Sequence, residues 1–295
     1  MHATDVNLRL SLRNLLFPTD FSETSQSALP YVQALAQWYG AKVFLLHAVP
    51  AEAPLPMPME SLPLALNAAW RQAKRHMEEF LDDNSLPAVP HQGLLEQGEF
   101  WDVVSGTIRT HSIDMIVLGT HGRTGFKKLL LGSMAEQIFR RASCPVLTIG
   151  PHASTHPASV NDWKHILFAT DFSPASLHAL HYALSLAEEN QADLTLLHMV
   201  PLVPLQQQNQ VRENMQKRLQ ALVSPDALAW CTPHYDVRFD FAIDGILSAA
   251  KETHADVIVM GVHTARAPRV VCHMPWAAAY EVVCQAPCPV LTVRA

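Results

Sequence analysis

Residues 114–122 read Asp-Met-Ile-Val-Leu-Gly-Thr-His-Gly, and residues 132–136 read Gly-Ser-Met-Ala-Glu. The apolar run predicts a buried strand, and Ser133 with Glu136 three residues later has the spacing of a capping box that opens a helix. A strand, a glycine-bearing loop and a helix start in this order bind anions in α/β proteins, because loop N–H groups and the positive helix end converge. Glycine lets the backbone approach a phosphate closely or take a positive φ. The stretch therefore predicts a phosphate-bearing ligand.

The composition limits the class of protein. The chain has 295 residues, 49% apolar and 16% charged, which suits two folded domains of about 150 residues each. A net charge of −6 argues against nucleic acid as the main partner, since nucleic acid favours a basic face. No apolar run reaches the roughly 18 residues of a membrane span. Residues 1–7 lack the layout of a signal peptide, and five cysteines do not form a disulfide framework. We expect a cytoplasmic protein with no nucleic-acid or membrane partner.

The chain contains the same pattern twice. Residues 15–22, Leu-Leu-Phe-Pro-Thr-Asp-Phe-Ser, return at 166–173 as Ile-Leu-Phe-Ala-Thr-Asp-Phe-Ser. Three further blocks return in the same order, namely 45–49 at 196–200, 114–119 at 256–261, and 144–149 at 288–293. This order indicates duplication of a whole domain. We expect a domain at 1–150, a linker at 151–162 and a second domain at 163–295.

Within each copy, short apolar strands alternate with helical patterns. Ser22 is expected to cap a helix with apolar positions from Ala28 to Ala36, and Ser173 is followed by proline at the first helical position. We expect the later strands of the first copy near 42–48, 91–96, 114–119 and 145–149, and its later helices near 61–83, 99–111 and 133–142. Apolar strands joined by helices predict an α/β fold with a parallel sheet covered on both faces. Ligands of such sheets bind beyond the carboxyl ends of the strands.

At these residues the chain resembles a tandem universal stress protein, and the resemblance covers both halves. The ATP-binding branch of that family carries Gly-x2-Gly-x9-Gly-Ser/Thr, which Gly119, Gly122, Gly132 and Ser133 match without a gap. The resemblance implies two Rossmann-like domains of the adenine-nucleotide-hydrolase-like type, each with five parallel strands. It also implies an internal pseudo-dimer that pairs the last strands of the two domains, 145–149 and 289–293.

The resemblance implies a nucleotide site in the first domain, with ATP as ligand and Mg²⁺ on its phosphates. ADP and AMP are alternative ligands, since backbone contacts do not require one phosphate charge. Adenosine is assigned to the ends of the first two strands, and ribose and phosphates to the glycine-bearing loop and the helix start. The implied nucleotide-binding residues are Thr19, Asp20, Ala48, Gly119, His121, Gly122, Arg123, Gly132, Ser133 and Met134. No catalytic residue and no protein metal ligand is assigned.

The second copy departs from this motif. Thr264 replaces the second glycine, and Trp276 and Ala277 replace the Gly-Ser pair. Tryptophan at a glycine position blocks the close approach of a phosphate, and Ala277 offers no side-chain cap. We therefore expect ATP in the first domain only. Asp171 survives in this copy, which favours a partly structural role for Asp20 as a turn residue.

Several other residues have structural interpretations. His47 and His198 are interpreted as packed, hydrogen-bonded histidines rather than metal ligands, and Cys144 and Cys288 as small buried residues. A zinc site is the alternative for four residues whose spacing fits no standard structural zinc pattern. They are His263, Cys272, His273 and Cys284. The apolar segment 53–59 is either a surface loop or a lid or partner contact.

No catalytic constellation is present: the chain has no Gly-x-Ser-x-Gly, no His-Glu-x-x-His and no Walker lysine. The expected function is therefore a stress-response sensor or regulator that binds ATP, with at most slow, incidental hydrolysis. One alternative is a non-nucleotide scaffold that binds a partner protein or an apolar ligand through the region of Met274 and Trp276. Another is a slow ATPase or autophosphorylating protein. The regulatory partner is unidentified, and a monomer or a homodimer of tandem chains is equally allowed.

Overall fold

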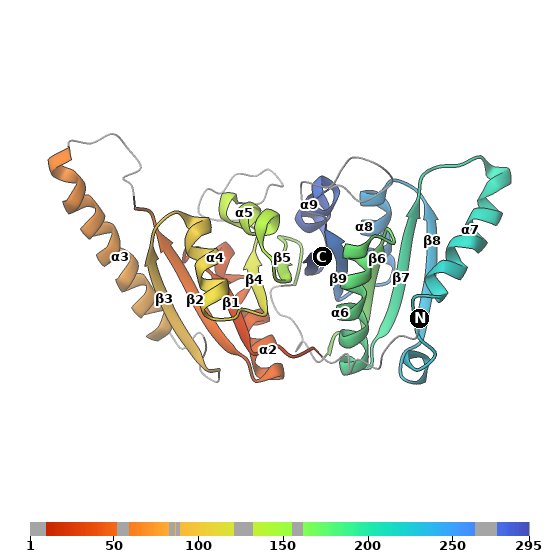
Figure 1. Cartoon of the computed structure of the whole chain (residues 1–295), viewed down its shortest axis with the longest axis horizontal. Helices are drawn as coiled ribbons and strands as arrows, with labels where there is room; N and C mark the ends of the chain where they lie inside the picture. Colours follow the sequence, from red (N-terminus) through yellow and green to blue (C-terminus); the bar gives the residue numbers. More distant parts are fainter. Residues whose placement is uncertain are drawn as a thin grey trace. The chain divides into compact units, whose positions relative to one another are not determined.

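The chain folds as two compact α/β units (Figure 1). The computed structural model describes residues 10–51, 59–82, 86, 89–120, 132–154, 162–262 and 276–294, with the backbone alone at Thr24, Met59, Trp276 and Ala277. The first domain holds Leu12–Ile149. The second holds the described residues from 162 onward, together with Gly150–Ser154 and the two residues that precede Leu12.

The helices and strands follow the expected order. The first domain contains β1 (Asn14–Pro18), α1 (Glu23–Gln26), α2 (Leu29–Tyr39), β2 (Lys42–Val49), the 3₁₀ turn η1 (Met59–Ser61), α3 (Leu62–Asp82), β3 (His91–Gln97), α4 (Phe100–Thr110), β4 (Met115–Gly119), α5 (Ser133–Arg141) and β5 (Val146–Ile149). The second contains β6 (His165–Thr170), α6 (Pro174–Asn190), β7 (Asp193–Val200), α7 (Leu205–Gln220), the 3₁₀ turn η3 (Ala227–Ala229), β8 (Pro233–Phe239), α8 (Ala242–Glu252), β9 (Val257–Val262), α9 (Trp276–Gln285) and β10 (Val290–Arg294). The elements expected from 42 onward in the first copy lie within one residue of their predicted bounds.

Both domains have the same sheet topology. In the first, the described strands lie in the order β3-β2-β1-β4-β5, and each neighbouring pair is parallel. In the second, the order is β8-β7-β6-β9-β10, again with parallel pairs. All carboxyl ends of one sheet therefore lie at one edge. The chain runs outward in one direction from β1 and then in the other from β4, so the gap between these two strands is the switch point where such sheets bind ligands.

The central strands are buried on both faces, which is why they read as continuous apolar runs. Leu15, Leu16 and Phe17 of β1 have no exposed surface, and neither do the residues from Val257 to Met260 in β9. Helices flank the sheet in each domain (Figure 1). No helix in the described part of the chain is long and apolar enough to cross a membrane.

The helix after the first strand differs between the two copies. Ser22 caps α1 as expected, since its hydroxyl accepts a hydrogen bond from the Ser25 N–H. The expected single helix is wrong, however: it ends at Gln26 and α2 begins at Leu29. The cause is Pro30, which has no N–H for the carbonyl four residues earlier and whose ring crowds that carbonyl. In the second domain α6 runs unbroken from Pro174.

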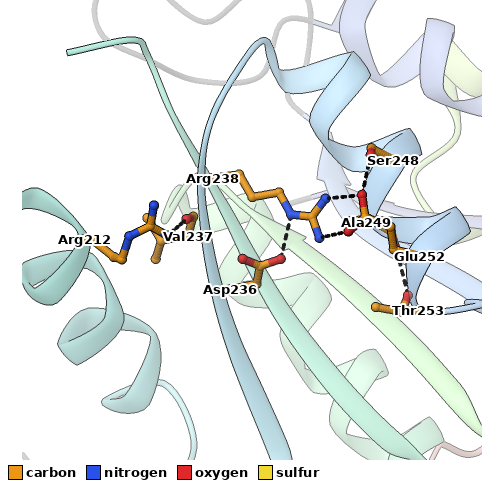
Figure 2. A network of polar contacts seen from close by, with 8 residues as sticks. All are labelled: Arg212, Asp236, Val237, Arg238, Ser248, Ala249, Glu252 and Thr253. Atoms are coloured by element: carbon orange, nitrogen blue, oxygen red, sulfur yellow. Dashed lines mark hydrogen bonds and ion pairs between the residues drawn. The ribbon is translucent and has the colours of Figure 1, made fainter. Parts of the chain in front are cut away.

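A network of hydrogen bonds and ion pairs connects β8 to α8 in the second domain (Figure 2). The Arg238 Nε donates to Asp236 at 2.7 Å, and its two terminal nitrogens donate to the two carboxylate oxygens of Glu252 at 3.1 and 2.8 Å. Ser248 Oγ donates to the same carboxylate at 2.6 Å. The hydrogen bond from Arg238 lowers the pKa of Glu252. Bidentate arginine–carboxylate pairs have defined geometry, so this network fixes the position of α8 against its strand.

Candidate nucleotide-binding site

The turn after β1 carries Asp20, the first predicted ligand residue. Thr19 is buried, and its Oγ1 accepts the Phe21 N–H at 3.0 Å and lies 2.7 Å from Ser25 Oγ. One carboxylate oxygen of Asp20 accepts the N–H of Ser22 at 3.0 Å and the hydroxyl of the same residue. Phe21 has a φ of +62°, in the left-handed region. Side-chain hydrogen bonds thus hold Asp20, half-buried, at the carboxyl end of β1.

The second domain contains the same turn. Thr170 Oγ1 accepts the Phe172 N–H at 3.0 Å and lies 2.9 Å from Ser176 Oγ, and Asp171 accepts the Ser173 N–H at 2.9 Å. Phe172 has a φ of +60°. An aspartate that accepts the N–H two residues later closes a turn by itself. The repeat therefore supports the structural interpretation of Asp20, and its contact with a nucleotide stays a prediction.

His47 and His198 are packed as predicted. The Nδ1 atom of His47 lies 2.8 Å from the Thr19 carbonyl oxygen, and that of His198 lies 2.8 Å from the Thr170 carbonyl oxygen. A carbonyl oxygen only accepts, so the proton is on Nδ1 in both rings. Burial lowers the pKa of His198. Among the residues that the structure describes, no group of three or more histidine, cysteine or acidic side chains could hold a metal ion.

Backbone hydrogen bonds bring the end of β4 and the start of α5 together. The Thr120 N–H donates to the Ile149 carbonyl at 3.1 Å, and the Gly132 N–H donates to the Thr120 carbonyl at 2.7 Å. The two ends of the segment 121–131 are thereby joined. His121, Gly122 and Arg123, which were predicted to contact the nucleotide, belong to that segment and lie outside the described residues.

The predicted capping box at α5 is wrong. The N-cap is Gly132, with φ −58° and ψ 153°, and the helix start has no side-chain cap. Ser133 is therefore the first helical residue, one position past the place where its hydroxyl could cap. The Glu136 N–H donates to the Gly132 carbonyl at 2.9 Å, and its carboxylate accepts from Arg140 at 3.2 Å. A helix start with a glycine cap and no capping side chain is suited to an anion, because its first N–H groups point outward.

The described part of the predicted site lies at one edge of the first sheet. Thr19 and Asp20 follow β1, and Gly119 is the last residue of β4. These two strands are paired, and the switch point is the gap between them. Ala48 lies near the end of β2, and the Gly132 bond places the start of α5 beside β4. Ser133 is exposed and Met134 is half-buried. The topology thus gathers the predicted adenosine and phosphate residues.

Gly261, the counterpart of Gly119, has a packing role that sequence reasoning missed. A Cβ at Gly261 would lie 2.2 Å from the Ser176 nitrogen and 2.3 Å from the Ala175 carbonyl carbon. The first turn of α6 therefore packs directly on the end of β9, with no room for a side chain. The available signal was the survival of Gly261 in a copy that has lost the other two motif glycines. By the repeat, we expect Gly119 to have the same role against α1.

The second domain has a larger residue at the strand position that Ala48 occupies in the first. Its counterpart is Met199, whose Sδ and Cε lie 2.8 and 2.1 Å from the place of a Cβ on Gly245 in α8. The thioether side chain of Met199 therefore lies directly against Gly245 in α8. Thr264 lies outside the described residues, and Trp276 begins α9.

Cys288 is buried as predicted, whereas Cys144 is half-buried. Burial raises the pKa of Cys144 and of Cys288 to about 12 in each case. Such thiols stay protonated near neutral pH, and the thiolate is the reactive form. Cys284 is buried in α9. The other three members of the alternative zinc set lie outside the described residues.

Two parallel sheets of the same order, with a helix start at the switch point of the first, define a tandem Rossmann-like protein. The model of the universal stress protein family matches residues 11–150 and 162–294. The chain therefore belongs to the universal stress protein family.

Known relatives include proteins of one and of two such domains. Over 162 residues the chain is 26% identical to universal stress protein MJ0577 of Methanocaldococcus jannaschii, with 46% of this chain and 94% of that protein covered. Over 267 residues it is 24% identical to a universal stress protein of Mycolicibacterium smegmatis, with 84% and 86% covered. The crystal structure of a universal stress protein from Archaeoglobus fulgidus matches with a TM-score of 0.70 at 19% identity, covering 95% of this chain and 98% of that one. This last likeness shows the shared fold.

Proposed function

We propose that this protein is an ATP-binding universal stress protein that holds one adenine nucleotide, in its first domain, and acts as a cytoplasmic sensor or regulator. The observation that carries the proposal is the helix start at Gly132. It has no side-chain cap, and a hydrogen bond to Thr120 fixes it beside the end of β4 at the switch point. Backbone N–H groups and the positive helix end at this place favour a phosphate.

Different residues of the proposed site contact the phosphates and the adenosine. The N–H groups at Ser133 and Met134 receive the outer phosphates, while Asp20 and Ala48 border the adenosine at the ends of β1 and β2. Mg²⁺ fits this site only through the phosphates, since the described residues offer no cluster of metal-binding side chains. Bound Mg²⁺ would neutralise phosphate charge. ATP, ADP and AMP remain competing ligands.

Differences between the two domains support a single site. Trp276 and Ala277 stand in the second domain where the first has Gly132 and Ser133. A tryptophan there hinders the approach of a phosphate to the backbone. Met199 also replaces the smaller Ala48 near the end of the second strand of the copy. We propose that the second domain takes no nucleotide, and that nucleotide occupancy of the first domain is the signal read by a partner.

We propose binding rather than turnover, because the sequence has no Walker lysine, no Gly-x-Ser-x-Gly and no His-Glu-x-x-His motif. Hydrolysis by this protein is therefore expected to be slow and incidental.

The test is calorimetric titration of the nucleotide-free full chain with Mg·ATP, ADP and AMP, alongside Gly132→Trp. Leu205→Trp is the matched control, because Leu205 is 80% exposed and distant in sequence from the motif. We expect about one site per chain, lost in Gly132→Trp and retained in the control. Two equivalent sites would refute the single-site proposal. Absence of binding to any of the three nucleotides would refute nucleotide binding and favour the scaffold alternative.

A further inference from the structure

The helix break at Pro30 separates a short element beside the candidate site from the rest of the first domain. The equivalent position in the second domain, 151 residues later, is His181, inside the unbroken α6. The same offset relates Ser22 to Ser173 and Ser25 to Ser176, so the two helices can be compared residue by residue. Proline is the difference that breaks one of them.

Hydrogen bonds connect the start of the short helix α1 to the turn that contains Asp20. The Ser25 N–H donates to Ser22 Oγ at 3.1 Å, and Ser25 Oγ lies 2.7 Å from Thr19 Oγ1. These bonds join α1 and the turn into one element. A movement of α1 therefore moves the Asp20 carboxylate.

At the carboxyl end of α1, backbone hydrogen bonds return to residues of α1 itself. The Ser27 N–H donates to the Glu23 carbonyl at 3.0 Å, and the Ala28 N–H donates to the Ser25 carbonyl at 3.2 Å. The helix α2 then starts from Ala28 without a side-chain cap, and its buried Tyr31, Val32, Leu35 and Ala36 anchor it in the core. The backbone at 27–28 is thus the junction between an anchored helix and a small element at the site.

The second domain has the same element at the start of an unbroken helix, α6. Ser173, Ala175 and Ser176 are each 1% exposed there. Burial in the first domain is similar position by position: Ser25 is 7% exposed, and Glu23 is exposed like its counterpart Pro174. The difference is the helix itself, because α1 ends at Gln26 and α2 begins at Leu29, and an element at an interrupted helix opens at lower free energy.

We propose that α1 and the Asp20 turn form a hinged element that closes on the bound adenine nucleotide, with the hinge at 27–28 set by Pro30. This inference rests on the proposed nucleotide site. Nucleotide binding orders the element, and the outward-facing side of α1 then presents a different surface to a partner. The second domain, which we propose to be nucleotide-free, has no such hinge.

The test is hydrogen exchange of the full chain followed by mass spectrometry, with peptides that cover 20–30 and, as an internal reference, 171–181. Without nucleotide, amides of α1 should exchange at least about tenfold faster than those at the start of α6. Saturating Mg·ATP should slow exchange at 22–28 and leave 173–179 unchanged. Equal exchange of the two segments without nucleotide would overturn the hinge.

Two substitutions give matched controls. Pro30→His should slow the exchange of α1 without nucleotide and change the affinity for ATP, with Pro30→Ala as a second variant in case the first folds poorly. His181→Pro should speed exchange at the start of α6 and leave the affinity unchanged. Unchanged exchange in both Pro30 variants would overturn the role of Pro30. Bound ATP without any change at 22–28 would overturn closure but leave the proposed function standing, whereas absence of ATP binding would overturn the proposed function itself.

Discussion

Substitution of Gly261 by alanine should strongly destabilise the second domain. The new Cβ would lie 2.2, 2.3 and 2.5 Å from three backbone atoms of Ala175 and Ser176, against 3.4–4 Å for an ordinary contact. Overpacking against side chains costs about 1–3 kcal/mol, and a helix backbone yields less readily, so we expect about 3 kcal/mol. For a domain of this size, that loss lowers the melting temperature by about 10 °C.

The assay is differential scanning calorimetry of the full chain, in which the transition of the second domain should move. Gly245→Ala is one control, because its Cβ would meet the flexible end of Met199 at 2.1 Å, which can rotate away. Gly106→Ala is another, since its Cβ site in α4 has no described atom within 4 Å apart from its chain neighbours and the backbone of its own helix. Removing a helical glycine there should stabilise by about 0.5–1 kcal/mol. A stability of Gly261→Ala within about 0.5 kcal/mol of the wild type would refute the packing role.

The same reasoning separates two roles for Gly119. If this glycine packs against α1 as Gly261 packs against α6, Gly119→Ala should lower the stability of the first domain. A selective loss of nucleotide affinity at unchanged stability would instead show that the backbone of Gly119 approaches a phosphate. Calorimetric stability and titration on one variant decide between the two.

Three further predictions concern the second domain. Thr170→Val leaves the Phe172 N–H without its acceptor and removes one of the two hydrogen bonds of the Ser176 hydroxyl, which still donates to the Ser173 carbonyl; this should reduce the free energy of unfolding in urea by about 1–3 kcal/mol, and an unchanged midpoint would contradict it. Cys288, with its pKa raised to about 12, should react with iodoacetamide only after unfolding, and rapid alkylation of the native protein, detected on its tryptic peptide, would show otherwise. Arg238 holds the pKa of Glu252 below 4.5, so this carboxylate stabilises the fold at neutral pH and ceases to do so as the pH falls through the lowered pKa. The melting temperatures of wild type and Glu252→Gln should therefore differ at neutral pH and converge in acid, and a constant difference would exclude this linkage.

The repeat and the apolar runs were sufficient to predict the parallel sheets, because a strand buried on both faces has a distinctive sequence. The α5 cap was predicted one residue too late. Its position depends on the ψ of Gly132 and the bond to Thr120, which no local pattern encodes. The break at Pro30 was visible in the sequence, but the apolar spacing on both sides favoured one helix.

The candidate site was predicted in part. The ends of β1, β2 and β4 meet where the topology requires, so Asp20, Ala48 and Gly119 lie at one edge. The packing role of Gly261 could not be predicted from the sequence. It depends on contact with the start of α6 at Ser176, which is 85 residues earlier in the chain. The residues between two such segments do not indicate that the two backbones are in close contact.

The bond between the Gly132 N–H and the Thr120 carbonyl has a consequence for which changes the first domain can tolerate. Because the ends of the segment 121–131 are fixed by the sheet, its content and length can be exchanged as a cassette. Doubling the length of a loop adds only about 0.6 kcal/mol of closure entropy. In the second copy the corresponding positions Gly261 and Trp276 are 15 apart instead of 13, a difference in length that this small entropic cost permits. The fixed ends thus separate the stability of the sheet from the sequence of the segment between them.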